Sequence, residues 1–94
     1  MIIVHWGRAK QFIKAHPKAY VPLNDWKDSV QEAQWKNFSE IRESHGDVSW
    51  VKGFLVFEIK GNDFRLLALA RFSLGRLYVK KVLTHAEYDK WKPR

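Results

Sequence analysis

Hydrophobic positions along this chain follow two periods, helical in the first half and alternating in the second. A short β-branched run at residues 2–4 predicts a strand. Apolar side chains then recur at helical spacing over residues 6–16, until Pro17 interrupts the pattern. A second helix is predicted to start at a cap formed by Asn24 or Asp25. Its apolar face comprises Trp26, Val30 and Ala33.

Beyond this second helix, Asn37 predicts a short helical turn, and Gly46-Asp47 a loop. From residue 48 apolar and polar side chains alternate, which predicts strands. Gly61-Asn62 fits a two-residue hairpin loop, and residues 73–75 fit a second turn before a strand at 76–83. Helices followed by antiparallel strands indicate one α+β domain over residues 1–94. We expect two N-terminal helices packed on a small, mostly antiparallel sheet, with a short C-terminal helix.

The two turns also predict which residues face one another in the sheet. With Lys60 paired to Asp63 across the first loop, Arg65 lies opposite Glu58. Pairing Phe72 with Arg76 across the second turn places Arg65 opposite Leu83, or opposite Thr84 after a one-residue slip. In either register, four ionisable side chains gather at one end of the sheet: Glu58, Lys60, Arg65 and His85.

The segment that follows this last strand reads Thr84-His85-Ala86-Glu87, a capping box for a helix. Leu83 and Tyr88 are spaced for the hydrophobic staple that accompanies such a start. Thr84, Glu87 and part of Tyr88 therefore have a structural explanation. A capping box needs no histidine, and at the first helical position the helix dipole favours the neutral ring, which can accept a proton. His85 is thus a candidate acid or base.

Charge is unevenly distributed along the 94 residues. Residues 60–94 carry a net charge of +6, whereas residues 1–59 carry +1. Such asymmetry suggests a polyanionic partner, with nucleic acid as the first candidate. Cations at Arg65, Arg71, Arg76, Lys80 and Lys81 interleave with aromatic residues at Phe64, Phe72, Tyr78 and Trp91, as on surfaces that bind single-stranded RNA. Phe64 and Phe72 are expected to face the core instead.

Several other chemistries lack their sequence patterns. The chain has no cysteine, which excludes disulfides, thiol catalysis and thiolate zinc sites. Its four histidines share no metal-ligand spacing, and neither a glycine-rich phosphate loop nor a GxSxG motif occurs. We therefore expect neither a metal nor a cofactor. No apolar run is long enough for a signal peptide or a membrane span, so a cytoplasmic protein is expected.

The run GNDFRLLALARF, followed about twenty residues after its arginine by THAEYDKW, resembles the HigB toxins of bacterial type II toxin–antitoxin systems. The resemblance implies a RelE-like fold and a ribosome-dependent, metal-free mRNA endonuclease, in which the RNA 2′-hydroxyl attacks the adjacent phosphate. Arg65 would clamp the phosphate, His85 would be the acid or base, and Tyr88 its neighbour or a stacking platform. The flanking cations would hold RNA: Lys60, Arg71, Arg76, Lys80, Lys81 and Lys90.

The same resemblance implies a HigA-type antitoxin, usually a helix-turn-helix protein, and contact with ribosomal RNA. Two other functions fit the residues. A toxin of the same fold could act by binding a protein, as gyrase-poisoning relatives do. A basic module could bind RNA or DNA without cutting it.

Overall fold

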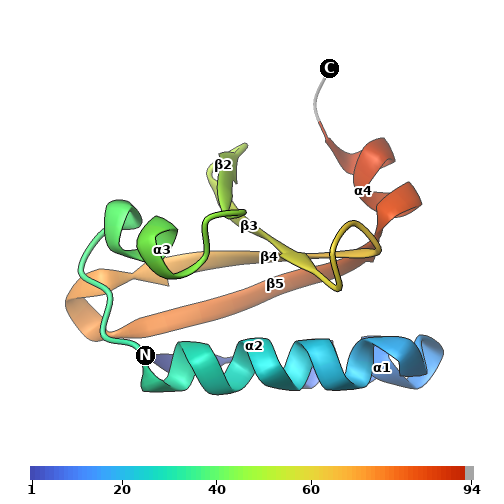
Figure 1. The fold of residues 1–94 in the computed structure, drawn as a ribbon, viewed down its shortest axis with the longest axis horizontal. Helices are drawn as coiled ribbons and strands as arrows, with labels where there is room; N and C mark the ends of the chain where they lie inside the picture. Colours follow the sequence, from blue (N-terminus) through green and yellow to red (C-terminus); the bar gives the residue numbers. More distant parts are fainter. Residues whose placement is uncertain (93–94) are drawn as a thin grey trace.

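The computed structural model describes residues 1–92 as an α+β domain built on one five-stranded sheet (Figure 1). The strand order is β1-β5-β4-β3-β2. β1 pairs parallel to β5, and every other neighbouring pair is antiparallel. The strands are β1 (Ile2–Val4), β2 (Ser49–Val51), β3 (Phe54–Ile59), β4 (Phe64–Arg71) and β5 (Arg76–Thr84). The helices are α1 (Gly7–Ala15), α2 (Tyr20–Glu32), α3 (Phe38–Ser44) and α4 (His85–Trp91), with 3₁₀ turns η1 (Pro17–Ala19) and η2 (Phe72–Leu74).

The second helix begins earlier than its sequence pattern suggests. α2 starts at Tyr20, so the expected cap at Asn24 or Asp25 is wrong. Pro22 lies in the first turn, where its missing N–H leaves no helical hydrogen bond unmade. Asn24 lies inside the helix, and its side chain donates to the Tyr20 carbonyl at 2.8 Å. The cap predicted at Asn37 is confirmed, because its side chain accepts from the backbone N–H of Glu40.

The register between β4 and β5 agrees with the prediction at the functional end and differs near the turn. Arg71, not Phe72, pairs with Arg76, because the connection is one residue longer than expected and includes η2. A β-bulge then shifts the ladder by one residue between Leu67 and Ala68. Arg65 therefore lies opposite Leu83 and Glu58, as predicted.

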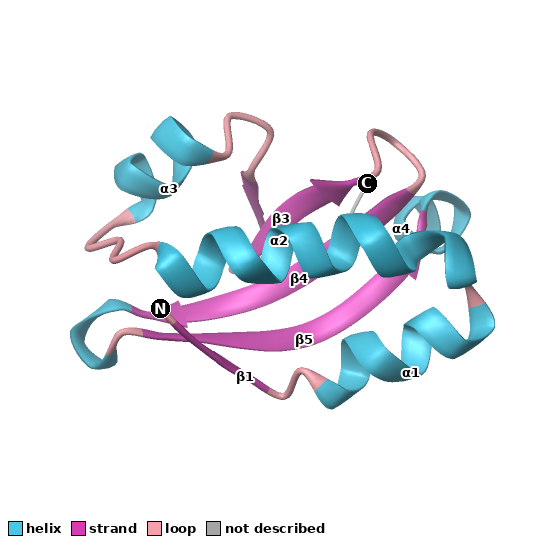
Figure 2. Cartoon of the chain, turned by 60° about the horizontal axis from the view of Figure 1, so that its bottom comes forward, coloured by secondary structure: helices cyan, strands magenta, loops and turns pink. Residues whose placement is uncertain are grey.

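The sheet has side chains packed on both faces. α1 and α2 cover one face, and α4 lies on the other, at the end of β5 (Figures 1 and 2). The main core lies under α1 and α2, and its largest fully buried members are Phe57, Leu23, Ile41, Leu55 and Leu66. A smaller cluster beneath α4 combines Val56, Leu67 and Tyr88 with flanking apolar side chains. This second cluster fixes α4 to the sheet by apolar burial.

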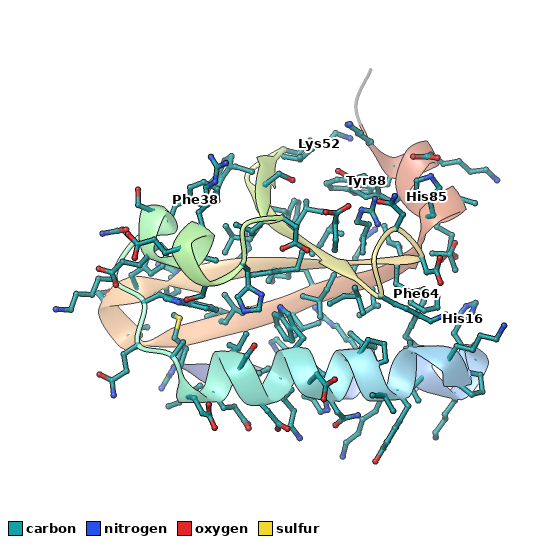
Figure 3. The ribbon with its side chains drawn as sticks, in the orientation of Figure 1. His16, Phe38, Lys52, Phe64, His85 and Tyr88 are labelled. Atoms are coloured by element: carbon teal, nitrogen blue, oxygen red, sulfur yellow. The ribbon has the colours of Figure 1, made fainter. Side chains whose placement is uncertain are left out.

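Phe64 and Phe72 belong to the main core, as predicted. Phe64 is buried and meets the Phe12 ring of α1 edge-on at 5.3 Å, while Phe72 packs partly buried against the same cluster. Strand alternation then points Arg65 to the opposite face, toward α4. In Figure 3 Phe64 and His16 accordingly lie on the α1 side of the sheet, and Tyr88 and His85 lie on the other. No helix within residues 1–92 is long and apolar enough to cross a membrane.

Candidate functional site

Arg65 is a buried cation at the junction of β3, β4 and α4. Only 7% of the residue is exposed. Its guanidinium donates to the Phe64 carbonyl and to the Asn62 side chain, both at 3.1 Å. Glu58, its cross-strand partner, forms an ion pair with it at 3.4 Å. The guanidinium carbon also lies 5.4 Å from the centre of the Tyr88 ring. The hairpin registers are what bring these groups together.

Tyr88 is the residue through which α4 covers Arg65. It is 7% exposed, and its ring stacks on that of Trp91 with centroids 5.8 Å apart. Burial raises the pKa of the Tyr88 phenol above its ordinary value, although the nearby Arg65 charge lowers it. The phenol therefore stays protonated at neutral pH, and it can pass a proton only to a strongly basic atom such as a leaving alkoxide oxygen. A base could stack on Tyr88 only where this small exposed fraction of the ring allows it.

His85 is the exposed ionisable group of the site. Its side chain is 54% exposed, and Nε2 lies 3.2 Å from a carboxylate oxygen of Asp89, one helical turn later. When Nε2–H donates to Asp89, the neutral ring carries its lone pair on Nδ1. The position and exposure of His85 thus suit proton transfer with a bound substrate.

Both ends of α4 are fastened to the sheet. At its start, the backbone N–H of His85 donates to the carbonyl of Asp63, which directly follows the predicted Gly61-Asn62 loop, at 2.9 Å. The predicted capping box is present, since Thr84 and Glu87 exchange hydrogen bonds at 2.9 and 3.2 Å. At its end, the Lys52 ammonium donates to the Trp91 carbonyl at 3.0 Å and lies 5.0 Å from the centre of its ring. Site geometry therefore depends on both hairpins.

The structure brings together only part of the predicted RNA-binding set. Lys60 lies beside the site and pairs with Asp63 at 3.1 Å. Lys90 is exposed on α4. Arg71, Arg76 and Lys80 lie farther along β4 and β5, whereas Lys81 pairs with Leu67, a member of the cluster beneath α4. Trp91, one of the candidate stacking residues, packs on Tyr88 and on the Phe54 ring at 5.7 Å.

Sequence reasoning missed Asn62 and Lys52 as parts of the site. The Asn62 side-chain oxygen accepts a hydrogen bond from Arg65. In the sequence, the Gly61-Asn62 pair indicates only a turn. Lys52 precedes Gly53 in the tight β2–β3 turn, where both residues have positive φ. Two residues with positive φ are typical of a type I′ hairpin, and the Lys-Gly pair was the available signal.

A pocket of about 480 Å³ lies away from this site, between the β1 strand, the loop after α2 and η2. Its described lining residues include no carboxylate, histidine or tyrosine, so they offer no acid–base pair. No group of three or more His, Asp or Glu side chains that could hold a metal ion occurs within residues 1–92. The Arg65–Tyr88–His85 arrangement is therefore the candidate site.

Comparison with known proteins points to the same family as the motifs of the second half. The chain is 25% identical over 93 residues to a protein named mRNA interferase HigB of Escherichia coli O6:H1, covering 96% of this chain and 90% of that relative. It is 41% identical over 34 residues to the mRNA interferase HigB of Shigella flexneri, covering 36% of this chain and 33% of that relative. Residues 19–91 match the model of the HigB toxin family, described as the RelE-like toxic component of a toxin–antitoxin system. The resemblance inferred from the motifs is confirmed, and the chain belongs to the HigB toxin family.

Proposed function

We propose that this chain is the toxin of a type II toxin–antitoxin system and acts in the cytoplasm as a ribosome-dependent mRNA endonuclease. Its family and the names of its relatives support this function. The observation that carries the proposal is an exposed His85 on α4, three residues before a protonated Tyr88 whose ring lies against the Arg65 guanidinium. These are the three kinds of group that transfer of a phosphoryl group without a metal ion needs: a base, an acid and a positive charge.

In the proposed reaction, Nδ1 of neutral His85 takes the proton from the RNA 2′-hydroxyl. The 2′-oxygen attacks the adjacent phosphorus, and the bond from phosphorus to the 5′-oxygen breaks. The leaving 5′-oxygen takes a proton, for which the Tyr88 phenol is the candidate donor. The products are a 2′,3′-cyclic phosphate and a 5′-hydroxyl end. No metal ion takes part in the proposed reaction.

Arg65 is proposed to stabilise the additional charge on the phosphate in the transition state. Because Asn62, Glu58 and the Phe64 carbonyl already contact the guanidinium, a directly bound phosphate would have to replace one of them. Without that exchange, Arg65 acts as a positioning residue for Tyr88. Arg65→Lys separates these roles, because a lysine keeps the charge but cannot make the bidentate contact.

The function is tested by inducing the chain without its antitoxin and mapping transcript ends. Wild-type induction should arrest growth and produce cuts placed relative to codons, and His85→Gln should relieve both while the fold survives. Lys18→Gln, which removes an exposed cation between α1 and α2, is the matched control and should remain toxic. Arrest with intact transcripts and a DNA-damage response would instead indicate a gyrase-type target.

Ribosome dependence and the partner need separate measurements. Purified toxin should cut mRNA on ribosomes and leave the same free mRNA intact. Equal cleavage of free mRNA would contradict the ribosome requirement. The proposed partner is a HigA-type helix-turn-helix antitoxin with an acidic segment complementary to the basic surface. Co-expression of a small helix-turn-helix protein encoded beside the toxin should restore growth, and purification of the toxin should recover that protein.

A further inference from the structure

A shallow pocket of about 230 Å³ lies on β4 and β5, at a distance from the candidate site. Leu69, Arg71, Tyr78 and Lys80 line it. Leu69 and Arg71 alternate in phase with Arg65, so the pocket opens on the face of the sheet that carries α4. Leu69 is four residues beyond Arg65, which corresponds to roughly 13 Å along the strand. A ligand here is separate from the group that reacts near His85.

The floor of this pocket is aromatic and apolar. Tyr78 is half-buried and pairs across the ladder with Leu69. The His5 ring flanks Tyr78, with centroids 6.1 Å apart. His5 has a φ of 66°, a left-handed conformation that few non-glycine residues adopt. A half-buried tyrosine over an apolar neighbour is a surface on which a nucleobase can stack.

The rim of the pocket carries positive charge that no carboxylate neutralises. Arg71 and Arg76 are direct cross-strand partners, and like charges in that position destabilise a sheet. Among residues 1–92, the two ion pairs and the His85–Asp89 contact lie elsewhere, so these two arginines have no carboxylate within 4.0 Å. A bound anion would offset their repulsion.

The β-bulge adds a second source of charge. Lys80 is the extra residue between Val79, which pairs with Ala68, and Lys81, which pairs with Leu67. Lys80 lines the pocket, and Lys81 pairs with Leu67, which lies on the face of the sheet that carries α4. The bulge therefore places two consecutive lysines on the same face of the sheet. Arg8 of α1 donates to the Val79 and Lys80 carbonyls at 3.0 and 3.4 Å, which holds the bulged backbone in place.

We propose that this pocket binds one nucleotide of single-stranded RNA outside the cleavage position. The base stacks on Tyr78 against Leu69, and Arg71 and Lys80 contact the flanking phosphates. The inference rests on the proposed function, because it takes RNA to be the ligand. An acidic protein segment would pair with the charges of Arg71 and Arg76, but its carboxylates would not stack on the Tyr78 ring.

Binding of an uncleavable 2′-O-methyl single strand, measured by fluorescence anisotropy over a range of salt concentrations, tests the proposal. Tyr78→Leu should weaken binding about ten-fold with the salt dependence unchanged, because stacking releases no counterions. Tyr78→Phe keeps the ring and should bind as the wild type does. Arg71→Gln and Lys80→Gln should each reduce the salt slope by about 0.7, the value for one phosphate contact on a single strand. Lys18→Gln should change neither quantity.

An abasic strand of the same length should bind wild type and Tyr78→Leu equally. Equal binding of the base-bearing strand by wild type and Tyr78→Leu would overturn the stacking assignment. Unchanged salt slopes in both charge variants would overturn the phosphate contacts. A poly-glutamate peptide is added as a competitor of the RNA strand. If it displaced the strand fully from wild type and Tyr78→Leu but did not bind Arg71→Gln, the surface would be assigned to an acidic protein. This assay contains no cleavage step. A chain that shows the expected binding changes but does not cut mRNA would therefore refute the proposed function and leave the nucleotide-binding proposal standing.

Discussion

The Arg65 guanidinium lies 5.4 Å from the centre of the Tyr88 ring, and this contact joins the start of the central strand β4 to α4. A buried cation over an aromatic ring contributes about 1 to 2 kcal/mol. Glu58 and Asn62 hold the guanidinium in place from β3 and the following loop. The position of α4, and with it that of His85, therefore depends on residues of the β3–β4 hairpin. Structural and chemical roles overlap at Arg65 and Tyr88, so variants must separate them.

Two replacements of Tyr88 distinguish packing from chemistry. Tyr88→Ala removes a buried ring from the small cluster beneath α4 and should lower the free energy of unfolding by about 3 kcal/mol. Tyr88→Phe keeps the ring, so its stability should remain within about 1 kcal/mol of wild type. Urea denaturation measures both. If the phenol donates a proton, Tyr88→Phe should cut mRNA more slowly while remaining folded; full activity would assign Tyr88 to packing alone.

A double-mutant cycle tests the Arg65–Glu58 pair. Arg65→Ala leaves Glu58 without its cation and should cost about 2 kcal/mol, between the values for exposed and buried pairs. Glu58→Gln should cost less, and the two changes together should show a coupling of about 1 kcal/mol. Additive losses would show that the ion pair contributes nothing beyond the separate side chains. Stability measurements by urea denaturation are sufficient, without any assay of activity.

Hydrophobic periodicity and turn residues predicted the α+β class, the hairpin at Gly61 and the end of the sheet where Arg65 and His85 meet. They did not predict where α2 begins, because Pro22 can either break a helix or occupy its first turn. The β-bulge was also beyond sequence reasoning, since no residue pattern marks it, and the Arg8 side chain that contacts the Val79 carbonyl there comes from a distant segment. The longer turn shifts the β4–β5 register by one residue, and the bulge shifts it back. The predicted pairing of Arg65 with Leu83 is therefore correct.

Candidate residues were easier to predict than their surroundings. The motifs identified Arg65, His85 and Tyr88, but no pattern indicated that Arg65 is buried or that Lys52 fastens the end of α4. Burial of an arginine depends on partners from three segments, which only the folded chain brings together. Local signals, such as the capping box at Thr84, were reliable because their hydrogen bonds lie within four residues.

Gly61 is predicted to be the sensitive position of the loop that supplies Asn62. Its φ is 61°, and an added Cβ would meet no atom within 4 Å, so the cost of Gly61→Ala is purely conformational. We expect a loss of about 1 kcal/mol in the free energy of unfolding. Gly61→Asn should cost less, because asparagine adopts the left-handed region more readily. Equal losses in the two variants would contradict this explanation. Thermal and urea denaturation provide the comparison.

His45 is predicted to make the fold sensitive to acid. It follows α3, its Nε2 lies 3.2 Å from the Ser29 hydroxyl, and its ring meets the edges or faces of Trp35 and Phe57. Burial lowers the pKa of His45 below its ordinary value of 6.5, although Asp47 opposes the shift. As the pH falls below about 6.5, the unfolded chain takes up the proton before the folded one does. Stability should therefore decrease on acidification, between about pH 7 and the lower folded-state pKa.

Urea denaturation at about pH 7.5 and about pH 5 measures this dependence. His45→Phe removes the titrating ring and should flatten the loss of stability between the two conditions, whatever its effect on stability at neutral pH. Asp47→Asn removes the charge that opposes the shift, so it should deepen the loss. A wild-type protein that is equally stable in both conditions, or a His45→Phe variant with an unchanged profile, would show that burial of His45 is not what couples this fold to pH.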